Sequence, residues 1–480
     1  MTVSSQALDA ISSIVGPRWI RRAPAQLDTY ASDGLPTRHA RPAAVVLPAS
    51  RDELIRVMQV LAHHGIPFVP RGAGTGLSGG AVGDAGQVVL VCTRLNRILE
   101  VDPHNRCATV EPGVVNVRLS EAVRAHGLHY APDPSSQSAC TIGGNVAENA
   151  GGPHCLKYGV TSSHVLALEV VLPDGVVVHL GSPSGDAWGP DLVGLFVGSE
   201  GMFGVATRIT VRLVPLPRAV RTLLADFTTI RGAGEAVSAI IASGLVPAAL
   251  EMMDRNCVRV VEASIYAAGY PVHAAAVLIV ELDGPDPAGV AAETAEIERL
   301  LRAHGAGTVR TAADDAERAR LWQGRKKAFG ALGRLNADLL VQDAVVPRSA
   351  LPDVLERIGA IAEEHGLEVS NVFHAGDGNL HPNLTFDRRR AGDLARVEHA
   401  SEAIMRACIA AGGTITGEHG VGSDKLRYMA MLFDGDTLGA MRAVRRAFDP
   451  LERANPGKVV PIHQCNEWRG RTRTLAGAAL

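Results

Sequence analysis

The stretch RGAGTGLSGGAV, residues 71–82, follows the apolar run IPFVP at 66–70, which predicts a short buried strand. Within it, GTGLSG at 74–79 satisfies G-x-G-x-x-G, the pattern of a dinucleotide-binding turn. That turn needs a helix directly after the glycines, and AVGDAGQVVLV at 81–91 cannot begin one. We therefore reject a Rossmann fold. Closely spaced glycines can still converge several backbone N–H groups on a pyrophosphate, with Arg71 as a charge partner, although the stretch alone fits a surface loop better.

Two further segments share this small-residue character. Residues 132–152 read PDPSSQSACTIGGNVAENAGG, and residues 197–207 read VGSEGMFGVAT just before an expected strand. Both combine little side-chain bulk with many backbone donors, so a ligand can approach the main chain closely. Three such segments in one half of the chain predict a long, polar ligand that is threaded through that half.

The composition excludes several classes of protein. The chain has 480 residues and a net charge of −3, which argues against a nucleic-acid footprint or a polybasic membrane patch. None of its seven cysteines forms a C-x-x-C pair, so no zinc ribbon or iron–sulfur run is present and reduced thiols are expected. The N-terminus carries no signal-peptide pattern, and no apolar run reaches the length of a transmembrane helix. We expect a cytoplasmic protein that contacts the inner face of the plasma membrane only peripherally or through a partner.

The pattern of secondary structure divides the chain into two α+β domains. The expected elements of the first are strands at 43–47, 66–70 and 87–91, helices at 53–65 and 116–127, a hairpin at 168–180 and a strand at 207–215. After Pro215-Leu216-Pro217 the chain alternates strand-like runs with Ala- and Glu-rich helices. We place the domains at 1–218 and 219–480.

The second domain holds a pair of histidines around a turn. HAGDGNLHPN, residues 374–383, reads as a strand, an Asp-Gly turn and a returning strand, which lets His374 and His381 approach each other. GGTITGEHGVG at 412–422 offers Glu418 beside His419. Two histidines and one carboxylate form a catalytic metal site that keeps an open coordination position. The alternative is that the two histidines only cap or pack a hairpin.

Six motifs, taken together, resemble one known family. They are PRGAGTGLSGG (70–80), TIGGNVAENAGGPHCLKYGV (141–160), GSEGMFGVATRITVRL (198–213), HAGDGNLHPNL (374–384), GEHGVG (417–422) and NPGKVVP (455–461). In this order they resemble the FAD-linked oxidase family, which has the vanillyl-alcohol-oxidase/PCMH fold. The branch that they resemble most is the FAD-linked subunit of glycolate oxidase, with D-lactate and D-2-hydroxyglutarate dehydrogenases as relatives. The resemblance implies a PCMH-type FAD-binding domain and an α+β FAD-linked oxidase C-terminal cap domain, with residues about 445–465 returning to the flavin.

The resemblance also implies the residues that bind FAD. The pyrophosphate group would be bound by Arg71, Gly72, Ala73, Gly74, Thr75, Gly76, Gly79 and Gly80. The isoalloxazine and ribityl portion would be lined by Pro132, Asp133, Thr141, Gly143, Gly144 and Asn145, with Gly151 and Gly152 nearby. The adenosine end would be faced by Glu200, Gly204 and Val205. Asn455 would return the C-terminal segment to the flavin site. Residues 70–83 contain no histidine that could attach the flavin, so the resemblance implies noncovalent FAD.

For the second domain the resemblance implies a metal site and a base. His374, His381 and Glu418 match the ligands of a divalent metal, either Zn or Mn/Fe, and His419 matches the base. The cation would act as a Lewis acid on the substrate oxygens, and His419 would accept the hydroxyl proton near neutral pH.

Two further residues are implied to bind substrate. Arg325 matches a Trp-x-x-Arg arginine that binds the substrate carboxylate, and Asn383 is expected to hydrogen-bond the same group. Val341 stands where the hydroxyglutarate branch has a lysine, which disfavours a second substrate carboxylate.

The implied function is FAD- and metal-dependent oxidation of a small (R)-2-hydroxy acid such as glycolate or D-lactate to the 2-oxo acid. Because the chain has no iron–sulfur motif, the electrons would leave through a second flavin-fold subunit and an iron–sulfur subunit toward quinone. The alternatives are a D-lactate or D-2-hydroxyglutarate dehydrogenase, a metal-dependent hydrolase that binds phosphate in its glycine loops, and a non-catalytic flavin-fold subunit.

Overall fold

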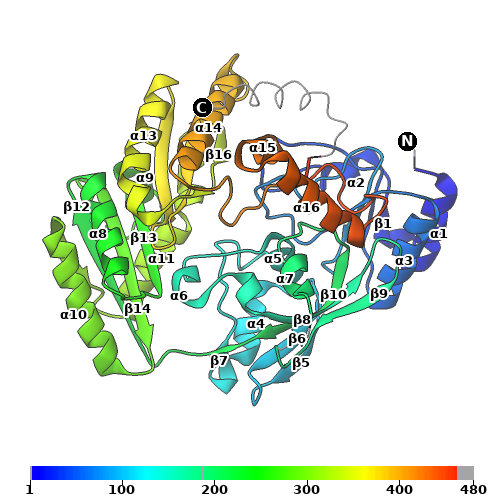
Figure 1. The fold of residues 1–480 in the computed structure, drawn as a ribbon, viewed down its shortest axis with the longest axis horizontal. Helices are drawn as coiled ribbons and strands as arrows, with labels where there is room; N and C mark the ends of the chain where they lie inside the picture. Colours follow the sequence, from blue (N-terminus) through cyan, green and yellow to red (C-terminus); the bar gives the residue numbers. More distant parts are fainter. Residues whose placement is uncertain (1–2, 186–188, 462–480) are drawn as a thin grey trace.

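A computed structural model describes residues 3–185 and 189–461. The chain forms two halves, with the blue to cyan elements of the first beside the green to yellow elements of the second (Figure 1). Among the described residues, the first half contains two larger sheets and one two-stranded sheet, and the second half contains one large sheet. The two α+β halves expected from the sequence are thus both present.

The glycine-rich stretch follows a strand of a small mixed sheet, in which β1 is antiparallel to β2. The strand order is β1-β2-β4-β3, with β2 and β3 both parallel to β4. The elements of this layer are α1 (Ser5–Val15), β1 (Ile20–Arg21), α2 (Pro24–Asp28), β2 (Ala44–Val46), α3 (Arg51–His63), β3 (Phe68–Arg71) and β4 (Val88–Val91). Ser50 caps α3 by accepting the N–H of Glu53, as expected for its sequence. No helix separates β3 from β4, which agrees with the rejection of a Rossmann fold.

The second sheet of this half is antiparallel, with strand order β5-β6-β10-β8-β9. Its strands are β5 (Ile98–Asp102), β6 (Cys107–Val110), β8 (Val165–Val171), β9 (Val177–Gly181) and β10 (Val205–Arg212), and a small pair joins β7 (Leu128–His129) to β11 (Val214–Pro215). Its helices are α4 (Asn116–Val123), α5 (Ile142–Glu148), α6 (Cys155–Tyr158) and α7 (Leu192–Phe196). The predicted helix at 116–127 ends as α-helix at Val123, and a 3₁₀ turn then leads to Gly127, whose φ of 69° suits glycine.

The second half is built on a nine-stranded sheet. Its main order is β15-β12-β14-β13-β18-β19-β17, and β20 pairs with both β16 and β18. The strands are β12 (Ala219–Phe227), β13 (Ala249–Asp254), β14 (Ala276–Gly284), β15 (Ala306–Thr311), β16 (Asp338–Val341), β17 (Ala344–Val345), β18 (Glu368–His374), β19 (Asn379–Leu380) and β20 (Pro382–Phe386). The sheet begins at Ala219, where we place the second domain.

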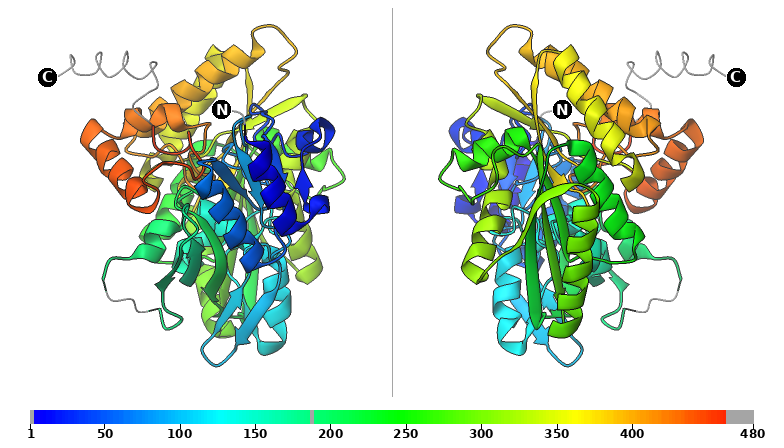
Figure 2. Two further views of the ribbon diagram at one scale, coloured as in Figure 1. Left: turned by 90° about the vertical axis from the view of Figure 1, so that its right-hand side faces the viewer. Right: turned by 90° about the vertical axis from the view of Figure 1, so that its left-hand side faces the viewer.

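Helices cover both faces of this sheet. One apolar core joins it to α8 (Ile230–Ala242), α10 (Pro287–Ala303), α13 (Leu351–Glu364) and α14 (Asp393–Ala410). Another core joins it to α9 (Arg255–Glu262), α11 (Asp315–Lys326) and α12 (Ala328–Leu332). Strand alternation explains the division, since Leu250 and Met252 of β13 enter the first core while Ala249 and Met253 enter the second. In both views of Figure 2 the yellow α13 and the orange α14 lie together.

The C-terminal segment returns to the first half. After α15 (Met429–Leu432) and α16 (Gly435–Phe448), Phe448 stacks on Phe203 with ring centroids 4.5 Å apart. Ala454 then forms a parallel bridge with Phe68 of β3. The described part of the predicted return at about 445–465 thus lies against the FAD-binding half, while residues 462–480 of the predicted second domain lie outside the described residues.

One predicted strand is interrupted at a functional position. The returning strand expected after the Asp-Gly turn is divided into β19 and β20, and His381 lies at the break. Both pieces pair with β18, but β19 has β17 as its other neighbour whereas β20 has β16. Pro382, which has no N–H to donate, begins the new strand.

Within the described ranges, no helix is both long and apolar enough to cross a bilayer. Six cysteines lie in those ranges and all six are free thiols, as expected.

Candidate active site

A cavity of about 200 Å³ lies where the two halves meet. The first half lines it with the glycine-rich stretch, the start of α5 and Glu200, and the second half lines it with His374, His381, Glu418 and His419. We call this space the main cavity. The predicted cofactor residues that line it are Gly72, Ala73, Gly74, Thr75, Gly76, Gly80, Thr141, Gly144, Asn145, Gly151 and Glu200.

Two glycines of the cavity wall have no room for a side chain. A Cβ atom at Gly72 would lie 2.5 Å from Oγ1 of Thr141, and one at Gly151 would lie 2.6 Å from Oε2 of Glu418. Thr141 is itself fixed, because its hydroxyl caps α5 by accepting the N–H of Gly144. The backbone therefore forms the surface of the cavity, as close approach to an extended cofactor requires. These residues fit FAD.

Several predicted cofactor residues lie elsewhere. A second, smaller cavity of about 60 Å³ shares Gly72 and Thr141 with the main cavity, and its lining includes Arg71, Gly143, Gly204 and Val205. The guanidinium of Arg71 is occupied, because it donates to the carbonyl oxygens of Ser32 (2.9 Å) and Ala81 (3.1 Å). Arg71 therefore ties the glycine-rich stretch to the N-terminal segment, and it does not line the main cavity.

The remaining predicted cofactor residues support the walls. Asn455 donates to the carbonyl oxygens of Gly80 and Glu200, at 3.0 and 2.6 Å. Gly79 packs against Ser423, and a Cβ there would lie 2.4 Å from the Ser423 hydroxyl. Pro132 accepts a hydrogen bond from the side chain of Asn116 through its carbonyl oxygen.

Asp133 and Gly152 lie at the domain junction, outside the lining of the main cavity. The Asp133 carboxylate pairs with His154 and with Lys326 of the second half, each at 3.0 Å. Gly152 has a φ of 146°, and a Cβ there would lie 2.7 Å from the carbonyl carbon of Asp133.

The two hairpin histidines and Glu418 converge on one point. Nε2 of His374 and Nε2 of His381 each lie 3.1 Å from Oε1 of Glu418. The ligand atoms of all three lie within 4.8 Å of one another, so one divalent cation fits among them. His374 and His381 are buried, and the turn at 375–378 that joins them contains Asp377 and Gly378, with a φ of 74° at the glycine.

Two carboxylates that the sequence did not reveal stand behind this group. Glu251 accepts a hydrogen bond from Nδ1 of His374 at 2.8 Å, although it is 123 residues distant in sequence. Asp343, which is fully buried, accepts the backbone N–H groups of Gly417 (2.9 Å) and His419 (3.1 Å) and pairs with Lys425 (2.9 Å). Asp343 therefore fixes the loop that carries Glu418 and His419.

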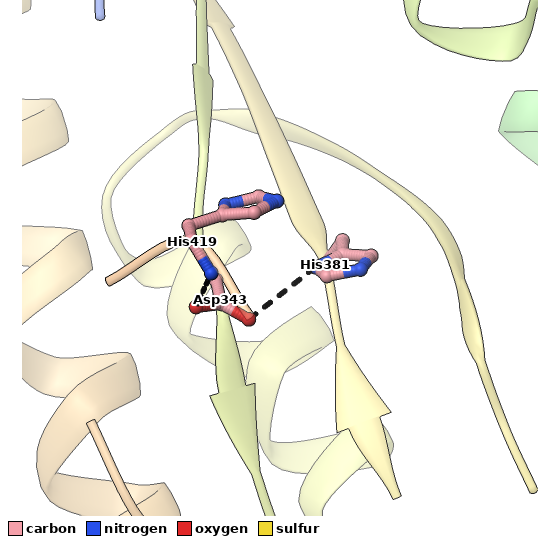
Figure 3. Close-up of side chains that lie close together, drawn as sticks. All are labelled: Asp343, His381 and His419. Atoms are coloured by element: carbon pink, nitrogen blue, oxygen red, sulfur yellow. Dashed lines mark hydrogen bonds and ion pairs between the residues drawn. The ribbon is translucent and has the colours of Figure 1, made fainter. Parts of the chain in front are cut away.

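His419 lies against His381 and above Asp343 (Figure 3). The two imidazole rings stack with centroids 4.9 Å apart and planes 4° apart. Burial is the largest effect on His419 and lowers its pKa to about 4, against the opposing charge of Asp343. The ring is therefore neutral near pH 7, with a lone pair on one of its two nitrogens.

The two predicted substrate residues do not line the main cavity. Arg325 is fully buried in α11 and forms an ion pair with Glu251 at 2.5 Å. Asn383 is also fully buried, and its amide donates to the carbonyl oxygens of Ser370 (3.0 Å) and His381 (2.6 Å). The structure thus places both residues behind the group formed by His374, His381 and Glu418.

Comparison with family models assigns both halves. Residues 42–181 match the model described as "FAD binding domain", and residues 216–459 match "FAD linked oxidases, C-terminal domain". The chain belongs to the FAD-linked oxidase family. It is an FAD-linked oxidoreductase, and the hydrolase alternative is set aside because the two models span both walls of the main cavity.

Curated members of the FAD-linked oxidase family match along most of the chain. The glycolate oxidase subunit GlcD of Escherichia coli is 48% identical over 92% of this chain and 88% of its own length. GlcD of Bacillus subtilis is 41% identical over 95% and 97%, and a D-lactate dehydrogenase of Archaeoglobus fulgidus is 34% identical over 90% and 96%. GlcD is named as a subunit, so these two relatives belong to assemblies.

Among solved structures, p-cresol methylhydroxylase with bound substrate matches with a TM-score of 0.80 and 17% identity, covering 94% of this chain and 96% of that one. At this identity the match shows the fold alone, and it confirms the predicted PCMH-type architecture.

Proposed function

We propose that this FAD-linked oxidoreductase oxidises a small (R)-2-hydroxy acid to the 2-oxo acid with the help of a divalent metal ion. The observation that carries the proposal is the main cavity itself. Its FAD-binding wall and the group His374, His381, Glu418 and His419 face the same space. A hydride acceptor, a Lewis acid and a base are the three parts that oxidation of a 2-hydroxy acid needs.

The residues of the chain divide this work. His374, His381 and Glu418 would hold the cation, and the neutral ring of His419 would accept the hydroxyl proton at a ring nitrogen. Gly151 packs against Glu418 so closely that the FAD-binding wall and the ligand set are in contact. When bound, the cation supplies polarisation of the substrate oxygens and FAD supplies the acceptor for the hydride.

The relatives suggest the substrate. GlcD is a subunit of glycolate oxidase and the archaeal relative is a D-lactate dehydrogenase, so we propose glycolate, with D-lactate as the alternative. Val341, which pairs with Asn383 between β16 and β20, offers no charge to a second substrate carboxylate, and this disfavours D-2-hydroxyglutarate. Binding of the substrate carboxylate by Arg325 or Asn383 stays part of the proposal.

The electrons need a further acceptor. Since GlcD is named as a subunit, we propose that a second flavin-fold subunit and an iron–sulfur subunit receive them and pass them toward quinone. A cytoplasmic location, with peripheral contact to the inner face of the plasma membrane, belongs to the same proposal.

A substrate panel tests this function. The purified FAD-loaded chain is assayed with an artificial electron acceptor against glycolate, both enantiomers of lactate and D-2-hydroxyglutarate, with the bound metal quantified in parallel. We expect turnover of glycolate and D-lactate, little turnover of L-lactate, and about one divalent ion per chain. Equal turnover of both lactate enantiomers, or full activity without metal, would contradict the proposal.

A further inference from the structure

We infer that Glu251 is a positioning residue, whose carboxylate fixes the imidazole of His374 so that Nε2 faces Glu418 and a bound cation. This inference rests on the proposed metal site and names a residue outside its ligand set. Glu251 was not singled out by any motif, since it lies within the strand segment ALEMMD of β13.

The sheet brings Glu251 and His374 together. They are direct partners in the antiparallel pairing of β13 with β18, and the two backbones therefore fix the distance between the side chains. Oε1 of Glu251 lies 2.8 Å from Nδ1 of His374, and both residues are buried, with 1% and 4% exposure. Water is thus excluded from this hydrogen bond.

Arg325 neutralises the carboxylate from behind. Its Nη2 lies 2.5 Å from Oε2 of Glu251, and the arginine is fully buried. A buried carboxylate without a cationic partner is costly, so this ion pair keeps Glu251 charged and directed at His374. The result is a row of three groups: the guanidinium of Arg325 on α11, the carboxylate of Glu251 on β13 and the imidazole of His374 on β18.

The arrangement selects one tautomer of His374. A carboxylate can only accept a hydrogen bond, so Nδ1 keeps its proton, and in the neutral ring that a bound cation requires the lone pair lies on Nε2. Nε2 is the atom that lies 3.1 Å from Glu418. A carboxylate behind a ligating histidine orients the ring and raises its basicity toward the metal, and its loss typically costs about 10- to 100-fold in metal affinity.

His381 lacks an equivalent support. Its Nδ1 has no hydrogen-bond partner, and the nearest carboxylate oxygen, Oδ1 of Asp343, lies 3.8 Å away. The two imidazole ligands therefore differ, and His374 is the one that the fold orients before a cation arrives.

The test measures Co²⁺ binding to the FAD-loaded chain, wild type and variants, by equilibrium dialysis and by the visible absorption of the bound ion. Glu251→Ala removes the acceptor, and Glu251→Gln keeps an acceptor oxygen but loses the charge. We expect at least tenfold weaker Co²⁺ binding in Glu251→Ala, a smaller loss in Glu251→Gln, and a changed Co²⁺ spectrum in both. If Glu251→Ala does not fold, Glu251→Gln decides alone.

A matched control separates this role from general destabilisation. Glu281 on the adjacent strand β14 is also a buried glutamate (2% exposed) paired with an arginine, Arg318, but it contacts neither metal-ligand histidine. Glu281→Gln is expected to lower stability and leave the affinity and spectrum of bound Co²⁺ unchanged. Wild-type affinity and spectrum in the folded Glu251 variants would overturn the inference while leaving the proposed function intact. A wild-type chain that binds no divalent cation would instead overturn the proposed function, and the inference with it.

Discussion

Glu200 of the FAD-binding half holds the loop that carries Glu418 and His419. Its Oε1 accepts the backbone N–H of Val421 at 2.6 Å, and its Oε2 accepts that of Gly422 at 2.7 Å. The carboxylate is buried and its own carbonyl oxygen accepts from Asn455. One residue of the first half therefore fixes the proposed base and a proposed metal ligand of the second half against the glycine-rich wall.

Replacing Glu200 tests this connection. Glu200→Ala leaves two buried N–H groups without an acceptor, which costs roughly 2–4 kcal/mol of unfolding free energy. We also expect weaker metal binding, because the loop loses its attachment. Urea unfolding gives the first quantity and equilibrium dialysis the second. Glu296→Ala, which removes an exposed carboxylate on α10, serves as control and should stay within about 0.5 kcal/mol of wild type. Equal unfolding midpoints for the two variants would show that Glu200 does not hold the loop.

Local patterns in the sequence were sufficient for elements and motifs but not for what lies behind the site. The strand expected at 207–215 is found as β10, with Ile209 and Val211 buried, although Thr210 between them is buried as well. No local sequence pattern of this kind marks Glu251 or Asp343. Each acts on residues about 75 or more positions away, through sheet register and loop contacts that arise only when the chain folds.

For Arg71, too, the local sequence did not reveal the contacts of the side chain. Its place beside five glycines suggested an anion partner, yet its guanidinium donates to the carbonyl oxygens of Ser32 and Ala81. Ser32 lies 39 positions earlier, and no local pattern connects it to the glycine-rich stretch.

Removing the metal tests the ligand set. We expect a strong chelator to abolish hydroxy-acid oxidation and leave the flavin absorption unchanged, because the predicted FAD residues and the three ligands are separate side chains. Adding back Zn²⁺ or Mn²⁺ should restore turnover in the wild type. His381→Ala should not recover, since it lacks one ligand atom. Undiminished activity of metal-free protein would exclude the metal from the reaction.

If His419 is the base, replacing it should lower turnover without releasing the cofactor. His419→Ala should lower turnover roughly 10²- to 10⁴-fold, the range typical of a missing proton acceptor, while FAD and metal remain bound. Stopped-flow reduction of the flavin by substrate measures the affected step directly. His399→Ala, on the exposed face of α14, controls for the loss of an imidazole. Flavin reduction at the wild-type rate in His419→Ala would assign the base elsewhere.

His154 predicts how stability depends on pH at the domain junction. Its Nδ1 lies 3.0 Å from Asp133 of the first half and its Nε2 lies 3.3 Å from Glu281 of the second. Both partners are carboxylates, so the ring fits best when both nitrogens carry protons. Burial opposes the charge, but Asp133 and Glu281 outweigh it and raise the pKa of His154 from 6.5 to about 10.

A group whose pKa is higher in the folded state than in the unfolded state stabilises the fold when it is protonated. The contribution of His154 is therefore present in full below pH 6.5 and is lost as pH rises from 6.5 toward 10. We expect His154→Gln to lower the unfolding free energy by roughly 2–4 kcal/mol at pH 6 and by much less at pH 10. The difference between wild type and variant is the quantity to measure, by urea unfolding across this range, because other groups titrate equally in both. His126→Gln, which replaces an exposed histidine, should give a small difference at every pH. A gap between wild type and His154→Gln that stays constant from pH 6 to pH 10 would mean that the ring is not charged at the junction.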